Sequence, residues 1–189
     1  MKEKKHHIIL FVTGMLVFGS LYMPTLIFAQ KNEVGYRKLM LGYTREQIQQ
    51  IVNKEFKTDY KTADEGSTLI LTRVIIDKPA VLIALVFDQK NILYKINVKM
   101  KKTVSNPSPD EAMKVIVDKY GKPKKRTLTN TLDLMAYWHL DNNRYEIFFQ
   151  NIASWDKFEV QYTDTIVQKQ KEEYDKEMNK KPANKELDF

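Results

Sequence analysis

Few side chains in this sequence could carry out acid–base or nucleophilic chemistry. His139 is the only histidine after the first seven residues, so a Ser-His-Asp arrangement would have to use it. No serine stands in a Gly-x-Ser-x-Gly elbow, and no glycine-rich phosphate-binding loop occurs. Cysteine is absent, and a single histidine cannot make a histidine-rich metal site. We therefore expect no enzymatic activity, no metal site and no cofactor.

A hydrolase that works with two carboxylates remains an alternative, because acidic residues are plentiful. Asp77 and Asp141 form the most suggestive pair, since they occupy equal positions in two similar stretches of the chain. Each of them is also expected to begin a hairpin turn. Aspartate is common there because its side chain hydrogen-bonds to the nearby backbone. The turn role is the favoured interpretation.

The first 29 residues have the pattern of a secretory signal peptide. A basic start at Met1–His7 precedes an uncharged run over residues 8–29, which is broken by Pro24 and ends in the small residue Ala29. We expect cleavage before Gln30 and export to a periplasm or to the medium. The alternative is a membrane anchor formed by residues 8–29, because a spanning helix needs about 20 apolar residues.

Two stretches that are 64 positions apart share one pattern. Thr44 and Ser108 each open a capping box, followed by a helical stripe of apolar residues and then three alternating strands. We predict an α+β fold of two tandem α-β-β-β repeats, residues 41–104 and 105–164, which share an antiparallel sheet with helices on one face. Residues 30–40 form a lead-in, and residues 165–189 form a charged C-terminal helix and tail.

The helix openings also resemble a known fold. Gly42-Tyr43-Thr44 with Ile48 and Ile51 is similar to the helix opening of the β-lactamase-inhibitor-protein-like fold, and Gly121-Lys122-Pro123 resembles its helix closure. That fold includes small outer-membrane lipoproteins of the SmpA/OmlA type, although the lipid-bearing cysteine is absent here. The resemblance implies an exported, non-enzymatic module that binds another protein with an open sheet face.

Strand alternation suggests which residues would form that face. In the second repeat Leu134, Ala136 and Trp138 are expected to face the helices, while Met135, Tyr137 and His139 face outward. The 64-residue offset then predicts an outward set in the first repeat that includes Leu69, Leu71, Arg73, Ile75, Leu82, Ala84 and Val86. The candidate partner-binding residues are Leu71, Arg73, Ile75, Met135, Tyr137, His139 and Phe148.

An apolar sheet face of this kind should be covered. Two candidates remain open: the C-terminal helix folded back onto the sheet, or a partner, which would be another protein or a second copy of the chain. Aromatic, Arg and Met residues beside an apolar centre are typical of a protein-binding patch. We therefore expect an exported, non-enzymatic protein-binding module. The alternative is a structural envelope protein held at the membrane by an uncleaved N-terminal segment.

The charge pattern is a weak guide to partners. The formal net charge is +7, but the basic residues are spread along the chain, and nucleic acid is not an expected partner of an exported domain. One basic cluster stands out after the second helix. It is expected to be a solvated loop, with contact to anionic lipid headgroups as a weaker alternative. Its members are Lys122, Lys124, Lys125 and Arg126.

Overall fold

A computed structural model describes residues 33–75, 78–103 and 106–180, with only the backbone described at residues 74, 75, 78–80 and 180. These residues belong to one compact unit, Asn32–Phe189. The expected signal peptide, residues 1–29, lies outside the described residues, as do Asp77 and the tail from residue 181 onward.

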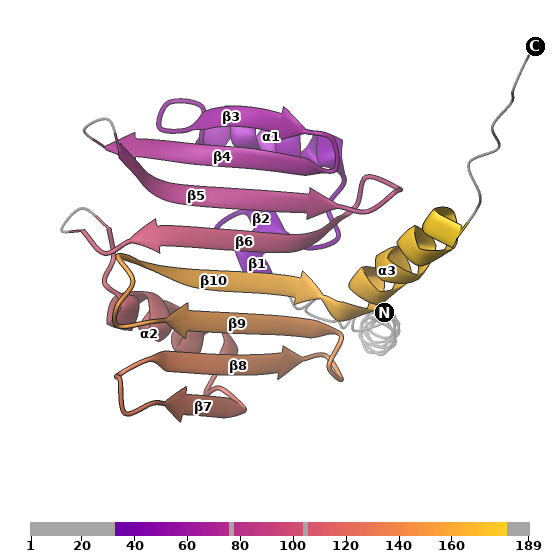
Figure 1. Ribbon diagram of the computed structural model, residues 1–189. Helices are drawn as coiled ribbons and strands as arrows, with labels where there is room; N and C mark the ends of the chain where they lie inside the picture. The colour runs from indigo at the N-terminus through magenta and orange to yellow at the C-terminus, as the bar shows by residue number, and fades with distance from the viewer. Residues whose placement is uncertain (1–32, 76–77, 104–105, 181–189) are drawn as a thin grey trace, which may run out of the picture. The chain divides into compact units, whose positions relative to one another are not determined.

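One large antiparallel sheet organises this unit. Its eight strands lie in the order β3-β4-β5-β6-β10-β9-β8-β7, so the two halves of the sheet meet where β6 pairs with β10 (Figure 1). The strands of the first half are β3 (Lys61–Glu65), β4 (Thr68–Ile75), β5 (Lys78–Phe87) and β6 (Leu93–Lys101). Those of the second half are β7 (Lys125–Leu128), β8 (Leu134–Leu140), β9 (Tyr145–Asn151) and β10 (Lys157–Asp164).

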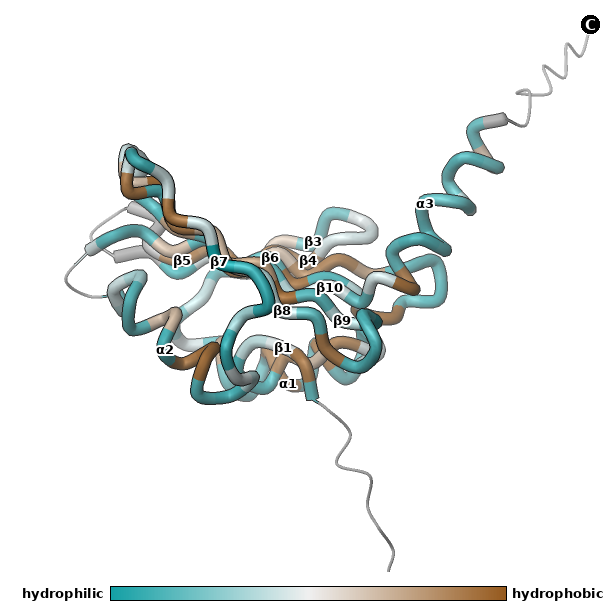
Figure 2. The backbone as a smooth tube through the Cα atoms, turned by 90° about the horizontal axis from the view of Figure 1, so that it is seen from below, coloured by the Kyte–Doolittle hydropathy of each residue, from teal (hydrophilic) through white to brown (hydrophobic). Residues whose placement is uncertain are grey.

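One helix precedes each half of the sheet, and both begin at the expected capping boxes. In α1 (Arg45–Glu55) and α2 (Pro109–Tyr120), the N-cap hydroxyls of Thr44 and Ser108 accept hydrogen bonds from the backbone N–H groups of Gln47 and Glu111. Gly121 ends α2 at a positive φ of 81°, where its N–H donates to the carbonyl of Val117. Both helices lie on one face of the sheet, here called the inner face (Figure 2).

A short hairpin, β1 (Gly35–Tyr36) and β2 (Leu39–Met40), lies on the same side of the sheet as the helices (Figure 2). The hydroxyl of Tyr120 at the end of α2 lies 3.2 Å from both the backbone N and the backbone O of Gly35. Leu39 is fully buried. The expected lead-in is therefore packed into the core through these contacts.

The core lies between this helical layer and the inner face of the sheet. Ile48 and Val52 of α1 and Ala112 and Ile116 of α2 are buried against it. Trp138 is the largest fully buried side chain, and its indole Nε1–H donates to the carbonyl of Gly121 at 2.7 Å. Burial of such apolar surface is the main source of stability in a fold of this size.

The C-terminal helix α3 (Thr165–Lys180) follows β10 directly. Asp164 is buried, accepts hydrogen bonds from the backbone N–H groups of Ile166 and Val167, and pairs with Arg144 at 3.1 Å. These contacts fix the start of the helix at the end of the sheet. Its described residues then lead away from the sheet and leave the outer face uncovered (Figures 1 and 2).

The α+β class, the antiparallel sheet and the C-terminal helix agree with the sequence prediction. The predicted number of strands was wrong, because each half holds four strands and not three. The additional strands, β3 and β7, lie at the two edges, and all their residues are exposed. Exposed edge strands need no apolar alternation, so their sequences carry little strand signal.

Candidate functional site

The second half of the sheet presents the expected residues on its outer face. Leu134, Ala136 and Trp138 are buried toward the helices, so the side chains between them point to the opposite side of β8. Met135, Tyr137 and His139 are therefore outward and partly exposed. Phe148 pairs with Tyr137 across β8 and β9 and shares that face. The predicted placement of all four residues is confirmed.

Tyr137 and Phe148 form an ordered aromatic pair at the centre of this region. Their rings stack with centroids 4.7 Å apart and an interplanar angle of 29°. Next to them His139 Nδ1 lies 3.8 Å from the carboxylate of Glu146, its cross-strand neighbour. We call the outward residues Met135, Tyr137, His139 and Phe148 the aromatic patch.

The first half of the sheet departs from the prediction. Leu69 and Leu71 are 3% and 0% exposed and belong to the core. Leu71 pairs with the buried Ile83, and Arg73 pairs with the buried Val81, so both point to the inner face. Leu71 and Arg73 are therefore wrong as outer-face residues. The side chain of Ile75 lies outside the described part of the chain.

A change in strand register explains the error. Ile83 and Ile147, which are 64 positions apart, pair with Val98 and Tyr162, which are also 64 apart. Their other partners are Leu71 and Trp138, which are 67 apart (138 − 71). An odd difference of three positions exchanges the two faces of a strand. The hairpins differ correspondingly, since two residues separate β4 from β5, with a bulge after Arg73, whereas four residues separate β8 from β9.

Arg73 has a structural role on the inner face. Its guanidinium Nη2 donates to the side-chain carbonyl of Asn106, a buried residue just before α2. The side-chain amide of Asn106 in turn donates to the backbone carbonyl of Lys101 at 3.0 Å. Arg73 therefore connects β4 to the segment that joins β6 and α2.

The outer face of the first half carries a different apolar group. Leu82, Ala84 and Val86 of β5 point outward as expected, opposite the buried Ile83 and Leu85. Ile70 of β4 pairs with Ala84 and therefore shares this outer face. The 64-residue offset had implied the inner face for Ile70, because it placed the neighbouring Leu69 and Leu71 outward. All four are partly exposed. We call Ile70, Leu82, Ala84 and Val86 the aliphatic patch.

A polar stripe on the two central strands separates these patches. The outward residues of β6 are Lys95, Asn97, Lys99 and Lys101, and those of β10 include Glu159 and Gln161. Lys99 and Glu159 form an ion pair at 2.9 Å across the two strands. The outer face is therefore apolar toward both sides and charged along its middle.

Of the two aspartates considered as a catalytic pair, only Asp141 lies in the described part of the chain. Asp141 begins the β8–β9 turn with φ of 48°, and its carbonyl accepts from the N–H of Arg144 at 2.9 Å, which confirms its turn role. Among the described residues, no three His, Asp or Glu side chains group so as to hold a metal ion. No helix in the described ranges is long and apolar enough to cross a membrane.

The basic cluster lies at the edge of the second half. Lys125 and Arg126 are in the edge strand β7, and Lys122 and Lys124 precede it; all four are exposed. Lys124 Nζ lies 3.4 Å from the side-chain oxygen of Asn143. Their exposure agrees with the expected solvated cluster, but the expected loop was wrong for Lys125 and Arg126, which belong to a strand.

Comparison with known proteins gives little further information. No protein-family profile matches the chain, and no curated protein matches it. Among solved structures, a DUF4309 family protein (YjgB) from Bacillus subtilis subsp. subtilis strain 168 is similar, with a TM-score of 0.43 and 11% sequence identity. The match covers 72% of this chain and 90% of that one.

Proposed function

We propose that this chain is an exported, non-enzymatic protein-binding module that contacts its partner with the outer face of the sheet. The observation that carries the proposal is that face itself. It carries the aromatic patch and the aliphatic patch, which the charged stripe on β6 and β10 separates. The described part of α3 leads away from this face (Figure 1). Apolar surface arranged in this way commonly marks an interaction site.

The aromatic patch has the composition of an interface centre. Tyr, Phe and Met bury a large apolar area, and the Tyr hydroxyl can still bond to a partner or to water. The stack of Tyr137 on Phe148 already holds both rings in place. Binding therefore loses less side-chain entropy than it would with freely rotating rings.

The charged stripe would select the partner. Lys99 and Glu159 are paired with each other, so a partner that buries this pair leaves neither of these two charges unpaired. A complementary surface would place apolar side chains against both patches and polar groups against the stripe. Mismatched surfaces would bury polar groups without partners, which costs about 1–3 kcal/mol each.

The export part of the proposal rests on the first 29 residues. Their basic start, uncharged run and small residue at position 29 are typical of a cleaved signal peptide. The resemblance of Gly42-Tyr43-Thr44 to the helix opening of an exported binding fold supports the same interpretation. Intact mass of the product collected outside the cytoplasm tests this part, and a product that retains Met1–Ala29 contradicts cleavage.

The binding part is tested by affinity capture with matched variants. Wild-type protein, Tyr137→Ala and Val115→Ala are each used to capture proteins from an envelope and medium extract of the producing cell. Val115 is the control because it is 66% exposed but belongs to α2, on the inner side. We expect one partner to be retained by wild type and Val115→Ala and lost with Tyr137→Ala. Equal retention by all three proteins contradicts the proposal.

A further inference from the structure

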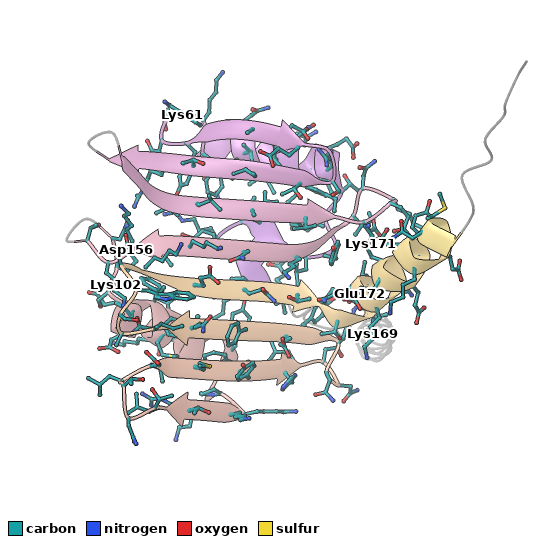
Figure 3. All side chains as sticks on the ribbon, in the orientation of Figure 1. Lys61, Lys102, Asp156, Lys169, Lys171 and Glu172 are labelled. Carbon is teal, nitrogen blue, oxygen red and sulfur yellow. The ribbon has the colours of Figure 1, made fainter. Side chains whose placement is uncertain are left out.

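A shallow depression lies at one end of the outer face and adjoins the aliphatic patch, since Lys99 in its lining pairs with Leu82 across β5 and β6. Its volume is about 500 Å³, and it is lined by Lys99, Ser154, Trp155, Asp156, Lys157 and Glu159. Most of the lining comes from the β9–β10 turn and from β10 itself. The turn lies at the end of the sheet where Lys102 and Asp156 are labelled, opposite the end from which α3 starts (Figure 3).

The depression contains an exposed tryptophan. Trp155 is 42% exposed, whereas Trp138, the other tryptophan, is 1% exposed. Exposing an indole leaves a large apolar ring in water, which is unfavourable unless a ligand or partner covers it. Trp155 makes no contribution to the core that would explain its presence at this position.

The turn that carries Trp155 is held by hydrogen bonds from three sides. The backbone N–H of Trp155 donates to the carbonyl of Ile152 at 3.1 Å, and the N–H of Ala153 donates to the carboxylate of Asp133 at 2.8 Å. The Nζ of Lys102 donates to the backbone carbonyl of Ile152, and the backbone N–H of Lys102 donates to the backbone carbonyl of Asp156, both at 2.8 Å. The backbone beneath the indole is therefore fixed before any ligand arrives.

The charges that line the depression balance. Two are cationic, Lys99 and Lys157, and two are anionic, Asp156 and Glu159. Lys99 pairs with Glu159 at 2.9 Å, and Asp156 lies 3.8 Å from Lys101 just outside the lining. Among the lining residues themselves, a ligand with a net charge meets no excess of the opposite charge. A neutral ligand with many hydroxyl groups could accept from the ammonium groups and donate to the carboxylates.

We infer that this depression binds a neutral oligosaccharide, with one sugar ring lying against the indole of Trp155. A pyranose ring has an apolar face of C–H groups that fits an aromatic ring and an equator of hydroxyls that fits alternating donors and acceptors. The depression is shallow, so a chain longer than one sugar can extend beyond it. This sugar site shares Lys99 and Glu159 with the charged stripe of the proposed protein-binding face but uses neither the aromatic nor the aliphatic patch.

Trp155 also provides the signal for the test. The purified protein is titrated with tetramers of N-acetylglucosamine and of β-1,4-linked glucose, while indole fluorescence and calorimetric heat are recorded. We expect saturable binding of at least one tetramer, with a change in the emission of the exposed indole. Trp155→Ala should weaken binding at least tenfold, and Glu159→Gln should weaken it less. Trp155→Phe, which keeps a flat ring, should retain part of the affinity.

Two controls distinguish a lost sugar site from unfolding and from the protein-binding face. Thermal melting of Trp155→Ala should match wild type, because the indole is exposed, so a lost signal reports the ligand site. Tyr137→Ala, which tests the protein-binding face, should leave the sugar affinity unchanged. The sugar site is overturned if neither tetramer binds saturably, if Trp155→Ala binds as well as wild type, or if an anionic polysaccharide such as polygalacturonate binds more tightly than both.

Discussion

The strands β4 and β8 occupy equal places in the two halves of the sheet but differ in how clearly their sequences indicate their faces. In β8 the buried Ala136 and Trp138 alternate with Tyr137 and His139, so polarity distinguishes the two sides. In β4 the three successive residues of 69–71 are aliphatic, and so are those at 74 and 75. A strand with apolar residues on both faces can be assigned to either register.

The two outer patches differ for the same reason. In the aromatic patch, Tyr137 and His139 differ in polarity from the core residues beside them, and Met135 and Phe148 share their face through strand alternation and pairing. The aliphatic patch consists of residues that resemble the core residues beside them, such as Leu82 next to Ile83. Truncating side chains on the two faces of each strand therefore tests which residues are core in each half of the sheet. The loss in the free energy of unfolding depends on how deeply the side chain is buried and not on its residue type.

The largest effect is expected at the inner face of the second half. Trp138→Ala removes a side chain that is 1% exposed and breaks its hydrogen bond to Gly121. We expect a loss of about 3–5 kcal/mol in the free energy of unfolding. The neighbouring outward variant Tyr137→Ala should cost far less. Chemical denaturation of both proteins measures the difference, and equal losses would mean that the aromatic patch is core.

A similar contrast between inner and outer residues is expected in the first half of the sheet. Here the buried residue is Leu71, which the sequence prediction had placed on the outer face. Leu71→Ala should lower the free energy of unfolding by about 2–5 kcal/mol, because Leu71 is fully buried. Ile70→Ala, one position away on the outer face, should cost clearly less. If Ile70→Ala proves the more damaging change in urea denaturation, the pairing of Leu71 with Ile83 is wrong.

Arg73→Ala should have an intermediate effect on stability. The change removes the donor to Asn106 and so loosens the link between β4 and the segment before α2. We expect a loss of about 1–3 kcal/mol in denaturant unfolding and no change in affinity for the partner. Thr72→Ala, on the opposite face of the same strand, is the matched control. A loss of partner affinity with an unchanged melting temperature would return Arg73 to the binding face.

The smallest effect concerns the turn beneath Trp155. Hydrogen bonds from the backbone N–H of Ala153 and then from the hydroxyl of Thr131 lower the pKa of Asp133. A lowered pKa in the folded state means that this carboxylate stabilises the fold above its ordinary pKa and ceases to do so as the pH falls through the folded value. Melting temperatures between pH 7 and pH 2 should therefore fall more in wild type than in Asp133→Asn. Parallel pH profiles would contradict this role.

Much of the fold could be predicted from the sequence where local chemistry determines it. The capping boxes at Thr44 and Ser108 fix the helix starts, and the polar–apolar alternation of β8 fixes its faces. The edge strands β3 and β7 could not be found, because exposed edges impose no pattern. The faces of β4 could not be found either, because the length of the β4–β5 connection and the bulge after Arg73 set its register.

The candidate site was predictable to the same extent. Met135, Tyr137, His139 and Phe148 were placed correctly, whereas Leu71 and Arg73 were assigned to the wrong face through a repeat offset that holds only in part. Trp155 was missed because a single tryptophan in a turn carries no periodic signal. Its exposure would have been suggested by the turn-forming residues Ser154 before it and Asp156 after it.

The central claim is that the outer sheet face, and not the helical side, contacts a partner protein. Photocrosslinking in the producing cell tests it most directly, with p-benzoylphenylalanine placed at position 137, at position 148 or, as the control, at position 115 in α2. We predict a crosslinked product of one defined mass from positions 137 and 148 and none from position 115. A product from position 115 alone, or no product from either outer-face position, would contradict the claim.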